Sequence, residues 1–111
     1  MNTLKNRVQL IGNLGNNPEI INTESGKKLA KFSLATNESY KNSQGEKTTE
    51  TQWHQVIAWN KTAEIVEKFA SQGKKIAVTG KLTNRSYEDS KGQKKYITEV
   101  VAQEILFLKN N

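Results

Sequence analysis

The sequence predicts a mostly β-stranded domain with one helix, and two patterns support this prediction. Apolar and polar residues alternate along most of the chain, as in residues 28–38, where Ala30, Phe32 and Leu34 share one face. Only one stretch, after Trp59, has apolar residues at helical spacing. With 111 residues, the chain (residues 1–111) is expected to form a single domain with a modest core.

The first half of the chain predicts two long strands and a long loop. Residues 7–12 alternate polar and apolar side chains and predict the first strand. Residues 13–18 are rich in Asn and Gly, which favour a turn, and residues 19–23 predict a short extended piece before the second strand at 28–38. Residues 40–50 are polar without an apolar period, so we expect a long, mobile hairpin loop there.

The second half predicts the helix and three more strands, at residues 51–59, 76–83 and 95–108. Thr62 is the expected N-cap of the helix, Ile65, Val66 and Phe69 form its apolar stripe, and Gly73 is the expected C-cap. The order is therefore three strands, the helix and two strands. This order is that of the OB-fold, a five-stranded Greek-key barrel with a helix between strands three and four.

The third strand carries two tryptophans on one face. Trp53, Gln55, Ile57 and Trp59 share that face, whereas His54, Val56 and Ala58 point the other way. A large flat surface beside Lys61 predicts a platform on which nucleic-acid bases stack, at about 1–3 kcal/mol per base. The alternative is that one or both indoles fill the core.

The fourth strand and the long loops continue this pattern. The polar face of the fourth strand has four residues: Lys81, Thr83, Arg85 and Tyr87. Tyr40 and Lys41 open one loop, and Lys95 closes the other. Aromatic residues therefore recur outside the core positions with cations between them, as binding of single strands requires. Glu64 and Glu67 on the helix argue against its insertion into a duplex groove.

Composition excludes several functional classes. Seventeen Lys and Arg against 11 Asp and Glu give a net charge of +6, which suits a polyanion. There is no cysteine and one histidine, and no nucleophile–base or carboxylate pair has useful spacing. We therefore expect no catalytic residue, metal or cofactor. No segment predicts a transmembrane helix or signal peptide, so a cytoplasmic protein is expected.

Four motifs in register resemble the bacterial single-stranded DNA-binding protein (SSB) family. They lie at residues 6–19, 34–40, 51–56 (with the pair Trp53-His54) and 80–100. The resemblance runs from about Asn6 to Val101, with a small length change in the loop at 40–50. It implies an OB-fold that coats single-stranded DNA without sequence preference in replication, recombination and repair, usually as a homotetramer.

The resemblance also implies roles for single residues. Trp53 matches a stacking tryptophan of the family, Trp59 stands where phenylalanine is frequent, and Tyr40 and Tyr87 stand where tryptophan is frequent. All four keep a π-face, so stacking is expected to survive.

Basic residues are common in the family at four positions: Lys41, Lys61, Arg85 and Lys95. Gln55 and Thr83 stand where arginine is frequent, so part of the phosphate-binding charge is missing. Lys31, Lys74 and Lys75 are the candidates to replace it.

An oligomer interface is implied for the first strand. In the family this strand pairs with its copy in a second subunit, and the histidine after the tryptophan lies near a subunit contact. We therefore expect Val8, Leu10 and His54 at an interface, although a lone inward histidine is more often a hydrogen-bonded structural residue. Family members usually continue into a flexible linker and an acidic tip. Residues 108–111 have neither, so tail-mediated partners are not expected for this chain.

Three alternatives to a general single-strand binder remain. The first is a specialised relative, such as a primosome or conjugation accessory, that binds RNA or DNA weakly as a dimer. The second is an OB-fold protein whose aromatic face docks another protein. The third, a nuclease or ligase fragment, has the least support, because the sequence has no clustered carboxylates.

Overall fold

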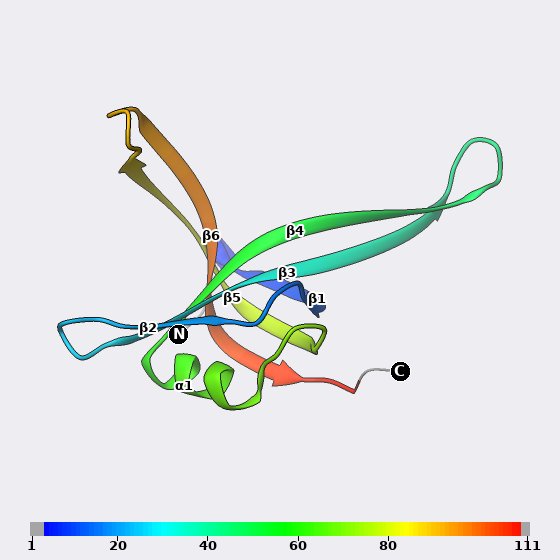
Figure 1. Cartoon of the computed structure of the whole chain (residues 1–111). Coiled ribbons are helices and arrows are strands. Elements are labelled where there is room, and N and C mark those ends of the chain that lie inside the picture. The colour runs from blue at the N-terminus through cyan, green and yellow to red at the C-terminus, as the bar shows by residue number, and fades with distance from the viewer. Residues whose placement is uncertain (1–3, 110–111) are drawn as a thin grey trace.

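The strands form one curled sheet, in which the first strand also meets a strand near the far edge (Figure 1). The computed structural model describes residues 4–109. Its elements are η1 (Leu4–Asn6), β1 (Val8–Leu14), β2 (Glu19–Asn22), β3 (Lys28–Lys41), β4 (Lys47–Trp59), α1 (Asn60–Phe69), β5 (Lys75–Glu88) and β6 (Lys94–Phe107). The strand order is β1-β5-β6-β4-β3-β2, and β1 also pairs with β3.

The additional pairing of β1 with β3 closes the barrel. Asn13 lies opposite Ala35, and Leu14 lies opposite Leu34. Five strands therefore form a closed ring, while the short β2 pairs only with β3 among the described strands. The helix follows the third barrel strand and precedes the fourth, as predicted for the OB-fold, because the expected extended piece is β2.

The core follows the predicted alternation. Ala30, Phe32 and Leu34 of β3 are buried, and Val56 and Ala58 of β4 are buried opposite them. Burial of alternate apolar side chains from every barrel strand fills a small barrel completely. The core prediction for the second and third strands is therefore confirmed.

The prediction of a long loop at residues 40–50 is wrong. β3 continues to Lys41 and β4 starts at Lys47, and the two strands pair without interruption up to Lys41 and Lys47. Only residues 42–46 form the turn, in which Asn42 Oδ1 accepts hydrogen bonds from the backbone N–H groups of Gln44 and Glu46. The β3–β4 hairpin is thus a long arm that leaves the barrel on one side, and β5–β6 forms a second arm (Figure 1).

The helix differs from its prediction at both ends. It begins at Asn60, where φ is 54°, so Thr62 lies inside the helix and Trp59 is the N-cap. Asparagine tolerates this left-handed conformation better than most residues, which lets β4 lead directly into α1. Ala70 is the C-cap. Gly73 instead has φ +87° in the following turn and donates a hydrogen bond to the carbonyl of Leu14.

The buried face of α1 is also displaced from the predicted stripe. Ala63 and Val66 are fully buried at the end of the barrel, whereas Ile65 and Phe69 are exposed. Phe69 packs edge-to-face on Phe107 with ring centroids 5.9 Å apart. The helix therefore covers one end of the barrel, opposite the side from which the arms extend (Figure 1).

Two glycines allow strands to approach more closely than a side chain permits. A Cβ atom on Gly12 would lie 2.1 Å from the carbonyl oxygen of Ala35, and one on Gly80 would lie 2.1 Å from that of Val101. Gly80 stands where the β5–β6 register shifts after Thr79. The first approach accompanies closure of β1 on β3, and the second accompanies the bend of β5 against β6.

Replacing Gly80 by alanine is expected to destabilise the barrel. The added methyl group must displace backbone, so we expect a loss of about 1–3 kcal/mol in the free energy of unfolding. Urea denaturation at one fixed protein concentration measures it. Ser86→Ala, in the exposed part of the same strand, is the control and is expected to change stability by less than about 0.5 kcal/mol. Equal midpoints for both variants would contradict the close approach.

Candidate nucleic-acid interface

One outward face of β3, β4, β6 and β5 collects most of the predicted binding residues. Cross-strand pairing sets Leu29 opposite Trp59, Lys31 opposite Ile57, Ser33 opposite Gln55, Ala35 opposite Trp53, Thr83 opposite Glu99 and Tyr87 opposite Lys95. These residues, with Lys81 and Arg85 on β5 and Ile97 and Val101 on β6, are called the candidate face below. Because side chains alternate along a strand, all of them project from the same side of the sheet.

The two tryptophans are exposed on this face. Trp53 is 59 % exposed and Trp59 is 38 % exposed, and Tyr87 near the tip of the second arm is also exposed. The alternative that the indoles fill the core is therefore wrong. Ile57 lies between them on β4 and is buried, so it contributes an apolar floor rather than a stacking surface.

Trp53 lies against the loop that follows β1. The backbone N–H of Gly15 donates to the carbonyl of Ser33 at 2.9 Å, and Asn16 Oδ1 accepts from the N–H of Ser33 at 2.9 Å. A Cβ atom on Gly15 would lie 2.4 Å from Cζ3 of Trp53. The missing side chain of Gly15 therefore makes room for the indole, and the loop supports it from one side.

A solvent-open pocket of about 470 Å³ lies in the candidate face. Its lining residues are Leu29, Lys31, Ile57, Trp59, Thr83, Arg85 and Glu99. They come from β3, β4, β5 and β6, so the pocket crosses four strands of the barrel. Volumes of this order accommodate small organic ligands, and the apolar floor with polar walls suits a planar heterocycle.

Arg85 and Glu99 form an ion pair in the wall of this pocket. Arg85 Nε donates to Glu99 Oε1 at 2.8 Å, and Nη2 donates to Oε2 at 3.2 Å. The Glu99 side chain is only 3 % exposed, whereas that of Arg85 is 49 % exposed. The hydrogen bond to Glu99, followed by the attraction between the two charges, raises the pKa of Arg85 above its ordinary value, so the guanidinium stays charged.

The sequence analysis did not identify Glu99 as part of the site. The signal was the alternation of Lys95, Ile97, Glu99 and Val101, which predicts that all four share one face. The alternation does not predict the diagonal ion pair between Glu99 and Arg85, because that contact depends on the register between β5 and β6.

Tyr40 does not share the face of the tryptophans. β3 has no irregularity between Leu29 and Lys41, so Tyr40 has the same parity as Phe32 and projects from the opposite side of the β3–β4 arm. The prediction that Tyr40 lies outside the core parity is wrong. Tyr40 is nevertheless exposed, because the arm has left the barrel at that point.

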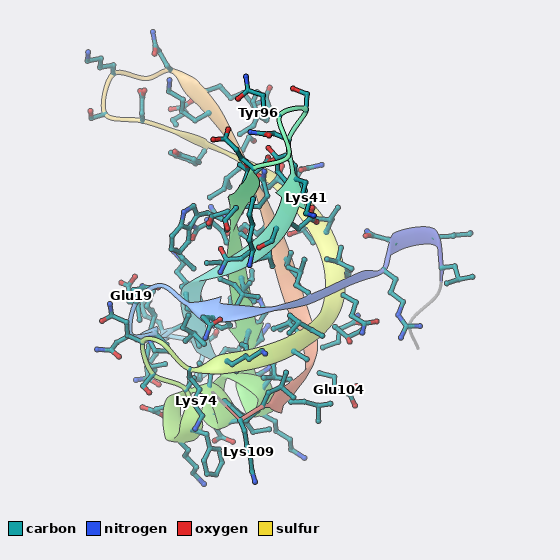
Figure 2. All side chains as sticks on the ribbon, turned by 90° about the vertical axis from the view of Figure 1, so that its right-hand side faces the viewer. Glu19, Lys41, Lys74, Tyr96, Glu104 and Lys109 are labelled. Carbon is teal, nitrogen blue, oxygen red and sulfur yellow. The ribbon has the colours of Figure 1, made fainter. Side chains whose placement is uncertain are left out.

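The remaining predicted cations are distributed around the candidate face. Lys41 keeps the parity of Lys31 but lies near the tip of the β3–β4 arm, and Lys61 lies in the first turn of α1. Lys74 lies at the end of the molecule opposite Lys41 (Figure 2). Lys75 lines a different pocket, beside Gly12 of β1. Neither Lys74 nor Lys75 therefore lines the pocket in the candidate face.

His54 is partly buried on the inward side of β4. Its Nε2 lies 3.0 Å from Oγ1 of Thr36, which makes it a hydrogen-bonded residue within one chain. Val8 and Leu10 pack against the core from β1. Their predicted place at an oligomer interface remains a prediction.

Within residues 4–109, no three His, Cys, Asp or Glu side chains cluster in a way that could hold a metal ion. The one α-helix in the same range is too short and polar to cross a membrane.

Comparisons with known proteins agree on one family. The model of the single-strand binding protein family matches residues 5–108. Single-stranded DNA-binding protein 3 of Listeria innocua is 39% identical over 107 residues, which cover 96% of this chain and 66% of the relative. Single-stranded DNA-binding protein 1 of Staphylococcus aureus (strain MSSA476) is 43% identical over 104 residues, covering 94% of this chain and 65% of the relative.

A solved structure gives the same result. The structure described as Plasmodium falciparum SSB complex with ssDNA superimposes with a TM-score of 0.86 at 31% identity, covering 98% of this chain and all of that chain. The curated relatives are longer: this chain spans between 40% and 66% of the length of the first three.

Replacing Gly15 by alanine is expected to displace the Trp53 indole. The new methyl group would overlap the ring, so the indole must move away from the loop. The indole N–H resonance of Trp53 in ¹H–¹⁵N spectra reports this, and we expect a shift in Gly15→Ala. Ser86→Ala is the control, because this exposed residue of β5 lies opposite Tyr96 of β6 and not beside Trp53. An unmoved Trp53 resonance in Gly15→Ala would exclude the packing described above.

Proposed function

Because the chain belongs to the single-strand binding protein family, we propose that it binds single-stranded DNA without sequence preference. The role we infer is to coat and protect the strand during replication, recombination and repair. The observation that carries the proposal is the exposure of Trp53 and Trp59 on one face of β4, beside basic residues of β3, β5 and β6.

The chemistry of the candidate face supports this function. Stacking on aromatic rings accepts every base, because every base has a π-face. Lys31, Lys81 and Lys95 stand on the same face and are available to neutralise phosphates. Gln55 stands where arginine is frequent in the family and carries no charge. Its Nε2 donates a hydrogen bond to Ser33 Oγ at 3.2 Å. Lys41 extends the candidate face along the β3–β4 arm, and Tyr40 presents an exposed ring on the opposite side of that arm.

We propose further that the protein is not catalytic and that it acts in the bacterial cytoplasm. Support comes from the curated relatives, which are bacterial and are named as DNA-binding proteins. Cleavage of a labelled single strand on addition of Mg²⁺ would contradict the non-catalytic part.

We also propose that the chain assembles into a homotetramer. Within residues 4–109, β1 pairs with β5 along Val8–Asn13 but with β3 only at Asn13 and Leu14. Its other edge therefore has unpaired backbone groups from residue 8 to residue 12, which a copy of β1 can satisfy.

Ile11, Ala77 and Leu106 lie side by side on three strands, and Ile11 and Leu106 are exposed large apolar residues. An exposed apolar row of this kind suits a second contact between subunits.

An OB-fold protein that docks another protein through its aromatic face is the second candidate. Binding of DNA with a strong salt dependence separates the two, because release of counterions from phosphates gives a slope that protein docking need not share.

Removing either indole is expected to weaken binding to oligo-dT. Trp53→Ala and Trp59→Ala each lose one stacking surface, so we expect a loss of about 1–3 kcal/mol, which is roughly 5- to 150-fold in Kd. Fluorescence anisotropy of a labelled oligonucleotide measures Kd without relying on the tryptophans. The controls are Trp53→Phe and Trp59→Phe, which keep a π-face and are expected to retain most of the affinity. Alanine variants that bind like the phenylalanine variants would contradict stacking.

Light scattering at micromolar concentration tests the assembly. We expect a mass four times the 12.5 kDa of one chain, and a smaller mass for His54→Ala. Thr36→Val is the matched control, because it removes the hydrogen bond within the chain and keeps the imidazole. If both variants retain the full mass, His54 is structural only and has no part in the subunit contact.

A further inference from the structure

We infer that Glu99 is a positioning residue that neutralises Arg85 and fixes its guanidinium in the pocket wall. The pocket then receives a nucleobase between this wall and Trp59, whereas lysines carry the phosphate contacts. The inference rests on the proposed binding of single-stranded DNA and deepens it, because it removes Arg85 from the predicted set of phosphate-binding cations.

The burial of Glu99 requires a partner for its charge. A carboxylate that is 3 % exposed has lost nearly all contact with water, and such a group is retained only when it is paired and hydrogen-bonded. Both of its oxygens receive a hydrogen bond from Arg85, at 2.8 Å and 3.2 Å. Two parallel bonds of this kind orient the guanidinium plane as well as neutralising it.

The pair is therefore close to neutral for an approaching phosphate. The Arg85 side chain is half-exposed, but its charge is compensated by a carboxylate in direct contact. Lys31, which lines the same pocket, and Lys81, on the same strand as Arg85, each add one positive charge to the face. Only changes in uncompensated charge alter the number of counterions released on binding.

The geometry of the pocket favours a base as its occupant. Trp59 and Ile57 contribute from β4, and Arg85 and Thr83 contribute from β5. An oriented guanidinium is a flat surface that stacks on aromatic rings, so the pocket has planar groups on two of its sides. A phosphate would instead meet the buried Glu99 carboxylate behind the only arginine in the lining.

The salt dependence of binding to oligo-dT tests the inference. Each phosphate neutralised on a single strand contributes about 0.7 to the slope of log K against log salt. Glu99→Gln uncovers the charge of Arg85, so we expect a slope steeper by about 0.7 and tighter binding at low salt. The matched control is Glu104→Gln on the same strand, which likewise removes one negative charge: Glu104 lies opposite Thr79 and does not line the pocket. Its slope is expected to stay at the wild-type value.

The double variant Arg85→Gln with Glu99→Gln gives an independent result. It removes both charges and leaves no buried carboxylate without a partner, so we expect the wild-type slope. A slope shallower by about 0.7 would mean that Arg85 binds a phosphate and would overturn the inference, as would an unchanged slope in Glu99→Gln. This variant also decides the question if Glu99→Gln alone fails to fold.

A measurement without DNA separates this inference from the proposed function. In ¹H–¹⁵N spectra of the wild-type chain, we expect the Nε–H resonance of Arg85 to exchange slowly with water, because Glu99 accepts it. Rapid exchange would overturn the inference. Absence of any binding to oligo-dT by a wild-type chain with a protected resonance would instead refute the function and leave the ion pair intact.

Discussion

The closure of β1 on β3 is the constraint on which the rest of the structure depends. It requires the backbone of Gly12 to reach the carbonyl of Ala35 with no side chain between them. Ala35 is also the cross-strand partner of Trp53, so the closure point and the exposed Trp53 indole are one strand apart. The loop that follows β1 then passes over β3 and supports the Trp53 indole at Gly15. Barrel closure and the orientation of Trp53 therefore have the same physical origin.

Alternation along single strands is enough to predict that the two tryptophans share one face of β4 and that the core residues of β3 and β4 lie on the other face. The face on which a side chain lies is a local property of its strand. The arms were not predictable in this way. Beyond Ala35 the β3–β4 hairpin has little apolar content, and its pairing depends on the backbone ladder and on cross-strand polar contacts. Thr51 Oγ1 donates to Asn37 Oδ1 at 2.7 Å, and Ser39 and Thr49 bring their hydroxyls within 3.4 Å. A polar stretch with such pairs resembles a loop in sequence.

The other differences come from interactions between distant segments. The direct passage from Trp59 into α1 depends on one left-handed residue, Asn60, and this overrides the capping preference of Thr62. Tyr40 lies on the face of Phe32 because β3 keeps its alternation without a bulge as far as Lys41. Glu99 needed the β5–β6 register, since its partner is 14 residues away in the chain. Local patterns thus predict faces, whereas register and closure decide which side chains meet.

The candidate face combines two kinds of interaction with different physical behaviour. On the proposed function, stacking on Trp53, Trp59 and Tyr87 would depend on ring surface and respond little to salt, whereas contacts of lysines with phosphates would weaken as counterions compete. The Arg85–Glu99 pair belongs with the first kind, because its compensated charge leaves a flat, oriented group. Gln55 and Thr83 extend the same tendency by placing neutral side chains beside the pocket. On the proposed function, such a surface would take its net charge from lysines such as Lys31 and Lys81, and its aromatic and neutral side chains would hold bases through contact area.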